Sequence, residues 1–248
     1  TEGMTTMEHR YPLMTSFAHA FTLAEPPRGR EYDSPSVPSM PASQQLLLAA
    51  TLVFVGAVVQ ALLALKAGAW KQARAQVVLM ALGFALQTGF IYLRGEEVRQ
   101  CPIRSLPDIL VFIAWSIVLL YFLVGSAFRL SLLGVFTAPL VTIMQVMAFM
   151  SGFAPYPPKG PINALVELHI ALALISYAAF ALACITGVMY LVQERMLKRH
   201  HIGGLFYQLP PIQGLAHAIQ RMVRLGLLLL SIALGISFAL HLPMTKTG

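Results

Sequence analysis

Seven histidines are the residues of this chain best suited to bind a metal, and two of them stand apart. His169 and His241 each lie at the edge of a long apolar stretch. The other five lie in polar or membrane-edge sequence: His9, His19, His200, His201 and His217. We expect those five side chains to be solvated or to lie at the level of the lipid headgroups, without a role in metal binding. His169 and His241 are therefore the candidates for chemistry, provided that the rest of the chain brings them together.

Six apolar stretches must position these two histidines. Each has about 20 residues, or close to it, which is what a helix needs to cross a bilayer core of about 30 Å. They are residues 46–65, 75–93, 109–128, 130–150, 168–192 and 225–242. Only Arg129 separates the third from the fourth, but together they have about twice the length of one crossing. The sequence therefore predicts an all-α, polytopic bundle of six transmembrane helices, with a tight turn at Arg129.

The distribution of Lys and Arg predicts the orientation of this bundle. Cytoplasmic loops retain positive charge. The odd-numbered loops hold nine Lys and Arg residues, whereas the even-numbered loops and the C-terminal end hold five, three of them close to Glu96, Glu97 and Asp108. We therefore expect the odd-numbered loops in the cytoplasm and both termini outside.

In this topology the fifth span enters the membrane from outside and the sixth leaves to the outside. His169 and His241 are then expected at about the same depth, at the outer edge. Two facing neutral imidazoles can supply both axial ligands of a haem iron. The helical face of His169 also carries Ala173, Ser176, Tyr177, Phe180 and Cys184, so that Tyr177 and Phe180 could wall a flat ligand. On spacing alone, a hydrogen bond from His169 to a neighbouring helix or a headgroup is the favoured explanation.

Composition excludes several other classes. With 57% hydrophobic and 11% charged residues, the chain is not an ordinary soluble domain. Cys101 and Cys184 are too few for a metal cluster, a covalent haem attachment motif or a disulfide framework. The net charge of +7 is explained by basic loops at a lipid bilayer, so no nucleic-acid partner is expected.

The first 45 residues differ from the rest. They hold five of the ten acidic residues and six of the 16 prolines, a composition that cannot bury a core. We expect 1–45 to be a disordered tail, with Met40 as the natural start, 46–242 to be the membrane domain and 243–248 to begin an external loop. Inside the spans, Gln60, Gln87 and the Ser231, Gly235, Ala239 stripe predict packing between helices.

Three segments resemble the cytochrome c assembly proteins of the CcsA/ResC type and their HemX/YpjD relatives. Residues 167–180 are similar to the family's histidine-bearing helix, in which a histidine before a Ser-Tyr-Ala-Ala run is an external haem ligand. Residues 101–116, continuing through 129–134, are similar to a segment that opens a membrane helix in the family, with Ser105 and Asp108 in place of Asn and Glu. Residues 221–235 resemble a further family helix.

The resemblance implies a haem-handling protein of c-type cytochrome biogenesis in the bacterial cytoplasmic membrane. It would bind b-type haem through His169, act as an assembly factor and not as an enzyme, and have a ResB/CcsB-like protein and apocytochrome c as partners. His241 matches no family ligand. The family's tryptophan-rich WWD loop does not follow residue 241, so the chain is either truncated or of the HemX/YpjD type.

Two alternatives remain open. A HemX-like regulator of haem biosynthesis would hold no haem, and its cytoplasmic segment 194–224 would carry the effect. A transporter would be indicated by inverted repeats or charges within the membrane, and the sequence pattern gives neither.

Overall fold

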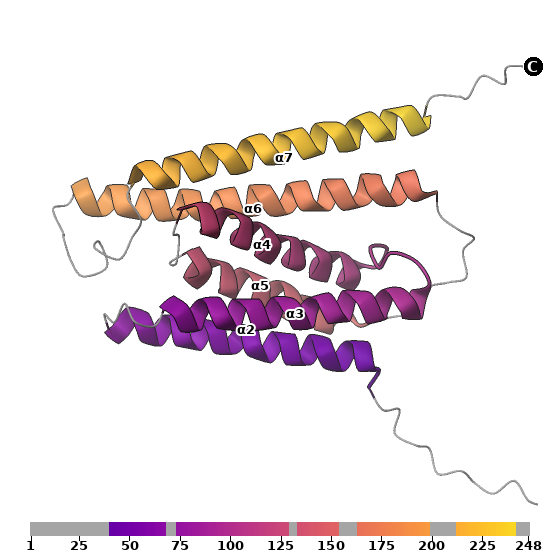
Figure 1. The fold of residues 1–248 in the computed structure, drawn as a ribbon, viewed down its shortest axis with the longest axis horizontal. Coiled ribbons are helices and arrows are strands. Elements are labelled where there is room, and N and C mark those ends of the chain that lie inside the picture. The colour runs from indigo at the N-terminus through magenta and orange to yellow at the C-terminus, as the bar shows by residue number, and fades with distance from the viewer. Residues whose placement is uncertain (1–39, 68–72, 129–132, 154–162, 199–211, 242–248) are drawn as a thin grey trace, which may run out of the picture. The chain divides into compact units, whose positions relative to one another are not determined.

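A computed structural model describes residues 40–67, 73–128, 133–153, 163–198 and 212–241. These residues form six helices and no strand, as Figure 1 shows. The helices are α2 (Ala42–Ala67), α3 (Ala73–Val98), α4 (Leu106–Phe128), α5 (Leu133–Ser151), α6 (Ala164–Lys198) and α7 (Ile212–His241). The all-α prediction is confirmed within this part of the chain, and so is the division of 109–150 into two helices. The calls on residues 1–39 and 243–248 lie outside the described residues.

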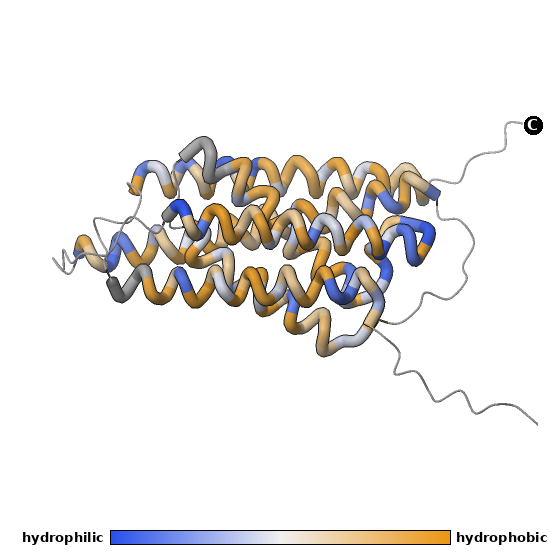
Figure 2. Tube along the Cα trace, turned by 60° about the horizontal axis from the view of Figure 1, so that its bottom comes forward, coloured by the Kyte–Doolittle hydropathy of each residue, from blue (hydrophilic) through white to orange (hydrophobic). Residues whose placement is uncertain are grey.

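All six helices are long and apolar enough to cross a membrane. Figure 2 shows hydrophobic residues along the length of the helices and hydrophilic ones gathered toward their ends. Large apolar side chains such as Leu52, Val78 and Phe238 are more than 60% exposed, which suits a surface that faces lipid tails. The protein is a multi-pass membrane protein.

Helix α4 is the most buried of the six. It contacts α5 and α6, and α2 packs against both α3 and α5. The completely buried side chains of α4 include Val111, Ala114, Ile117 and Val118. Helix α7 is held almost entirely by α6, which is its main neighbour. The position of α7 therefore depends on contacts with one helix.

Helices α6 and α7 are longer than the predicted spans. Their 35 and 30 residues measure about 52 and 45 Å at 1.5 Å per residue, whereas the bilayer core is about 30 Å thick. Most of the excess lies at the end where α6 finishes and α7 starts. There Leu215, Ala218 and Met222 of α7 are buried in the same core as Met189 of α6. Hydropathy predicted only the apolar part of each helix. Both helices extend past that part, where their side chains pack against each other.

Helix α2 begins at Ala42, directly after Pro41, and so four residues before the predicted span. The polar residues Ser43 and Gln45 belong to this first turn, where Gln45 Nε2 donates to the Met40 carbonyl at 2.8 Å. A span predicted from apolar residues alone misses such a polar helix start.

Gly83 marks a close approach of α2 and α3. A Cβ atom at this position would lie 2.7 Å from the Phe54 ring, which is fully buried. Gln87, one turn further along α3, donates from Nε2 to the Val111 carbonyl of α4 at 3.2 Å. The prediction that Gln87 joins helices is confirmed.

Replacing Gly83 by Val should lower the free energy of unfolding by about 1–3 kcal/mol, because the added side chain overlaps the Phe54 ring. Gly56→Val is the matched control, since a Cβ there meets nothing within 4 Å. Denaturant titration in mild detergent measures both. Equal losses in the two variants would contradict this account of the α2–α3 contact.

Candidate functional site

The connection between α3 and α4 is a short segment, residues 99–105, with defined ends. Helix α3 stops where Arg99 adopts a left-handed conformation with φ of 55°. Helix α4 starts at Ser105, whose Oγ accepts a hydrogen bond from the Asp108 backbone N–H at 3.4 Å. The Ser105 hydroxyl in turn donates to the Asp108 carboxylate. Ser105 and Asp108 have the three-residue spacing of a capping box, in which the Ser105 side chain caps the Asp108 N–H and the Asp108 carboxylate bonds back to the Ser105 hydroxyl.

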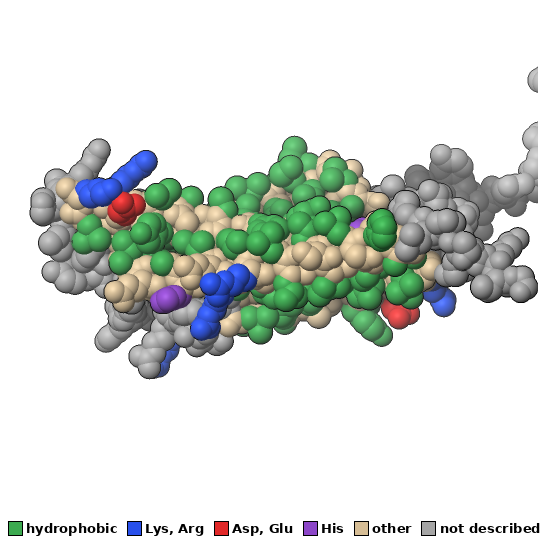
Figure 3. All heavy atoms as spheres, turned by 90° about the horizontal axis from the view of Figure 1, so that it is seen from above, with side chains coloured by type: hydrophobic (Ala, Val, Ile, Leu, Met, Phe, Trp, Pro, Cys, Tyr) green, Lys and Arg blue, Asp and Glu red, His purple; other side chains and the backbone are tan. Residues whose placement is uncertain are grey.

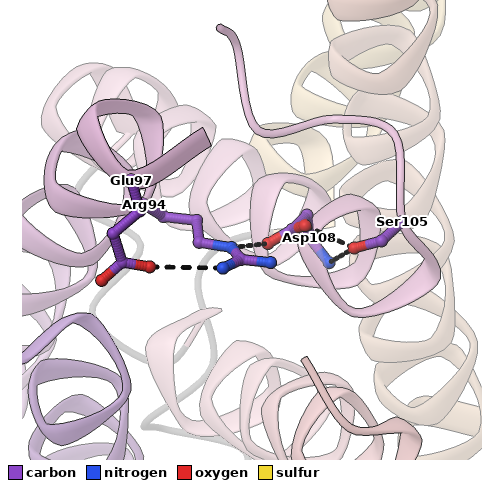
Figure 4. A network of polar contacts seen from close by, with 4 residues as sticks. All are labelled: Arg94, Glu97, Ser105 and Asp108. Carbon is purple, nitrogen blue, oxygen red and sulfur yellow. Dashed lines mark hydrogen bonds and ion pairs between the residues drawn. The ribbon is translucent and has the colours of Figure 1, made fainter. Parts of the chain in front are cut away.

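Asp108 also joins α4 to α3 through an ion pair. Its Oδ1 lies 3.2 Å from Nε of Arg94, and Arg94 Nη1 lies 3.2 Å from Glu97 Oε2, as Figure 4 shows. The Asp108 side chain is fully buried and that of Arg94 is 8% exposed. The Arg94 guanidinium also stands 5.6 Å from the centre of the Phe153 ring. Sequence analysis assigned these charges to a loop, whereas Arg94 belongs to α3 and Asp108 to the first turn of α4.

The same connection packs against α6. Ile103 is 2% exposed and lies in one apolar cluster with Leu174, Ile170 and Phe112. Ile170 directly follows His169, so the segment held by Arg94 and Asp108 supports the part of α6 that carries this histidine. Two signals in the sequence pointed to this segment: the Ser-x-x-Asp spacing before an apolar run, and the family resemblance of residues 101–116.

Cys101 lies in this segment close to the first turn of α6. Burial, and then the negative charge of Glu167, raise the pKa of the Cys101 thiol above its ordinary value. Glu167 is two residues from His169. The interaction with Glu167 therefore places Cys101 near the candidate site, and the raised pKa lowers the fraction of thiolate at neutral pH.

His169 is half-buried and faces α7. Its Nδ1 lies 2.7 Å from the backbone oxygen of Ala233. A carbonyl oxygen can only accept a hydrogen bond, so Nδ1 must carry the hydrogen. In the neutral ring, Nε2 then holds the free lone pair. The plainer sequence interpretation, a hydrogen bond to a neighbouring helix, is therefore confirmed, and it leaves one nitrogen able to act as a ligand.

Helices α6 and α7 also approach closely at Phe180. A Cβ at Gly226 of α7 would lie 2.7 Å from the Phe180 ring. Phe180 therefore fills the space between the two helices. Tyr177 is 51% exposed, and Cys184 is exposed as well. Ser176 is fully buried and donates to the Ala173 carbonyl at 2.7 Å. The residues predicted to share one face of α6 thus lie in three environments. Ser176 is in the core, Phe180 is at the contact with α7, and Tyr177 and Cys184 are exposed.

His241 lies further along α7 than the residue that His169 contacts. His169 faces Ala233, and His241, the last residue of α7, comes eight residues later. Eight helical residues correspond to about 12 Å along the axis. The two histidines come from neighbouring helices, as expected, but their backbones do not lie at one level.

No group of three or more His, Cys, Asp or Glu side chains that could hold a metal ion occurs in the part of the chain that the structure describes. A metal held by a macrocycle is a different case, because the ring supplies most of the ligands and the protein only the axial ones. The His169 imidazole, with its ring held by Ala233 and its Nε2 lone pair available, could supply one such ligand.

The described residues thus form six helices of membrane-spanning length, with an oriented histidine at one end of the two longest. The family model for "Cytochrome C assembly protein" matches residues 103–242, more than half of the chain. The chain belongs to this cytochrome c assembly family. The matched region includes α4, the capping box of Ser105 and Asp108, and His169.

Relatives in the family carry two kinds of name. The chain is 36% identical over 165 residues to Protein HemX of Brevibacillus brevis, which covers 64% of this chain and 60% of that protein. It is 24% identical over 169 residues to Protein HemX of Bacillus subtilis, and the alignment covers 65% of this chain and 60% of that protein. It is 31% identical over 113 residues to the cytochrome c biogenesis protein CcsA of Chlorella vulgaris, with 42% and 35% covered.

The matched region of the chain thus spans about 60% of the length of its HemX relatives. No solved structure matches the chain.

Asp108→Asn should destabilise the protein by about 3–5 kcal/mol, because it removes the fully buried carboxylate that pairs with the Arg94 guanidinium. Glu97→Gln removes the partly exposed partner of the same guanidinium and should cost less than about 1 kcal/mol. Unfolding of each variant in mild detergent measures the difference. If the two substitutions cost the same, the Arg94–Asp108 pair does not hold the α3–α4 connection.

Alkylation of Cys101 tests its distance from α6. In a Cys184→Ala background, Glu167→Gln should lower the pKa of the Cys101 thiol, because a nearby negative charge opposes formation of the thiolate. The rate of reaction with N-ethylmaleimide should then rise at a lower pH than in the parent. Glu96→Gln, an exposed change in the last turns of α3, is the control. An unchanged pH profile in Glu167→Gln would show that the two side chains do not interact.

Proposed function

We propose that this protein binds haem at the end of the bundle that carries His169 and presents it for c-type cytochrome biogenesis. The observation that supports this most directly is the 2.7 Å contact between His169 Nδ1 and the Ala233 carbonyl. Histidines that bind metals almost always donate their other ring N–H in this way. Membership of the cytochrome c assembly family supports the same function.

In this proposal the protein supplies ligation and orientation. The Ala233 carbonyl holds the His169 ring in one tautomer and makes Nε2 a better electron donor. Phe180, packed against Gly226, keeps α7 close enough to α6 for this hydrogen bond. The exposed Tyr177 ring, two turns along α6 from His169, offers an aromatic wall on the open side. Bound haem would contribute the redox chemistry of its iron.

A second protein ligand to the haem iron would have to come from another residue. His241 is our candidate because it ends the helix that contacts His169. An offset of about 12 Å between His241 and the level of His169 means that the end of α7 would have to shift or bend for both to bind one iron. A variant at each position separates their roles.

The rest of the proposal concerns location and partners. We propose that the protein lies in the bacterial cytoplasmic membrane with the His169 end outside, since the opposite ends of the helices carry the larger number of basic residues. It would act as an assembly factor and not as an enzyme, with a ResB/CcsB-like membrane protein and apocytochrome c as partners. The relatives named CcsA support this part of the proposal.

A HemX-like role in regulating haem biosynthesis, without bound haem, is the second candidate. Two relatives named HemX favour it. The extension of α6 and α7 beyond the apolar region would then be the active part, because it presents polar side chains within segment 194–224. The two candidates differ in whether His169 is needed.

The absorption spectrum of the protein purified from haem-replete cells distinguishes them. We expect a Soret band of low-spin haem that His169→Ala abolishes and that added imidazole restores, because free imidazole can occupy the vacated ligand position. His217→Ala, an exposed histidine in the extension of α7, should leave the band unchanged. Loss with His241→Ala would identify the second ligand.

The absence of haem in the parent protein, or a band that survives His169→Ala, would contradict haem binding by this residue. A regulatory effect that persists in His169→Ala and is lost when segment 194–224 is changed would favour the HemX-like role.

A further inference from the structure

One face of α7 gathers basic side chains at the point where the helix leaves its apolar region. His217, Arg221 and Arg224 are spaced four and three residues apart, so they follow one another along a single face. All three are exposed. Figure 3, which looks onto α7, shows Lys or Arg and His side chains together at one end of this face, beside a continuous hydrophobic surface.

The charge around this cluster is one-sided. Helix α7 has no acidic residue along its whole length. At the neighbouring end of α6, Glu194 is already paired with Lys198 at 2.7 Å, and Arg195 is exposed. In the described ends of α6 and α7, four Arg and Lys side chains thus accompany one carboxylate, so an anion that approaches the cluster meets a positive potential.

The cluster has a rigid support. The opposite face of the same turns carries Leu215, Ala218 and Met222, which are at most 5% exposed and belong to the core shared with α6. The arginines therefore project from a helix that is fixed on its other side. A ligand would not have to order this helix before binding.

The cluster lies where the long apolar stretch of α7 begins, and lipid phosphates are expected at such a boundary. Leu227 and Leu228 are the next residues on the exposed surface, and both are more than 50% exposed, as expected for side chains among lipid tails. Arg224 lies one turn before Leu228, and Arg221 lies one turn further out. Arginine stems of this length keep their charge at the headgroups while their carbons cover apolar surface.

We propose that the face formed by His217, Arg221 and Arg224 binds the phosphate of an anionic phospholipid. The two guanidinium groups would pair with phosphate oxygens, and His217 would donate a hydrogen bond from its ring. The site serves to hold the α6–α7 pair at a fixed depth in the bilayer, which α7 needs because it has α6 as its main neighbour. This proposal does not depend on haem binding.

Local lipid composition beside α7 tests the proposal. A fluorophore is attached at Gln220→Cys, an exposed position next to Arg221, in a chain with Cys101→Ala and Cys184→Ala. The protein is reconstituted in phosphatidylcholine bilayers, and quenching by spin-labelled phosphatidylglycerol is compared with quenching by spin-labelled phosphatidylcholine. The parent should prefer phosphatidylglycerol, by about fivefold for each arginine that contributes.

The variants make the result specific. The double variant Arg221→Gln with Arg224→Gln should abolish the preference, whereas Arg221→Lys with Arg224→Lys should keep most of it. Arg74→Gln is the matched control, because Arg74 is exposed at the same end of the bundle but on α3. Circular dichroism checks that each variant keeps its helices.

Three results would overturn the proposal. The first is equal quenching by the two lipids in the parent protein. The second is a loss of the preference in Arg74→Gln as large as in the double glutamine variant. The third is displacement of phosphatidylglycerol by inorganic phosphate at matched ionic strength, which would assign the site to a soluble phosphate.

Discussion

Polar groups inside a membrane can be satisfied only by other groups of the protein, because hydrocarbon offers no hydrogen bonds. This constraint fixes the connections of the described helices. Gln87 reaches from α3 to a backbone oxygen of α4, and Arg94 on α3 is neutralised by Asp108 at the start of α4. The apolar packing of Phe54 and Ile117 gives the bundle its core, but these polar contacts determine which helices lie next to each other and at which level.

The candidate site follows from the same constraint. His169 is half-buried near the end of an apolar helix, and its Nδ1 is satisfied by the Ala233 carbonyl. The hydrogen bond to Ala233 satisfies a partly buried N–H group. It also selects the tautomer in which the Nε2 lone pair is available. Structural and ligand roles for this histidine are therefore compatible. The capping box and ion pair of Asp108 support the site from the other side, through Ile103 against α6.

Much of this organisation was predictable from local sequence. Runs of apolar residues with about the length of a bilayer core identified the six described helices, including the division of residues 109–150 into α4 and α5. The family resemblance selected His169, and the comparison with known proteins confirms the family. The ends of α6 and α7 were not predictable in this way, because their polar turns are helical through side-chain packing with each other and not through hydropathy.

The sequence by itself determined that the chain is a helical membrane protein of this family, because hydropathy and motif spacing are properties of one segment at a time. Only the tertiary structure decided that His169 faces Ala233, that Phe180 fits against Gly226, and that Arg94 and Asp108 form a buried pair. Register between two helices depends on how the side chains of both interdigitate. A shift of one turn, about 5.4 Å, changes every contact while leaving each helix unchanged.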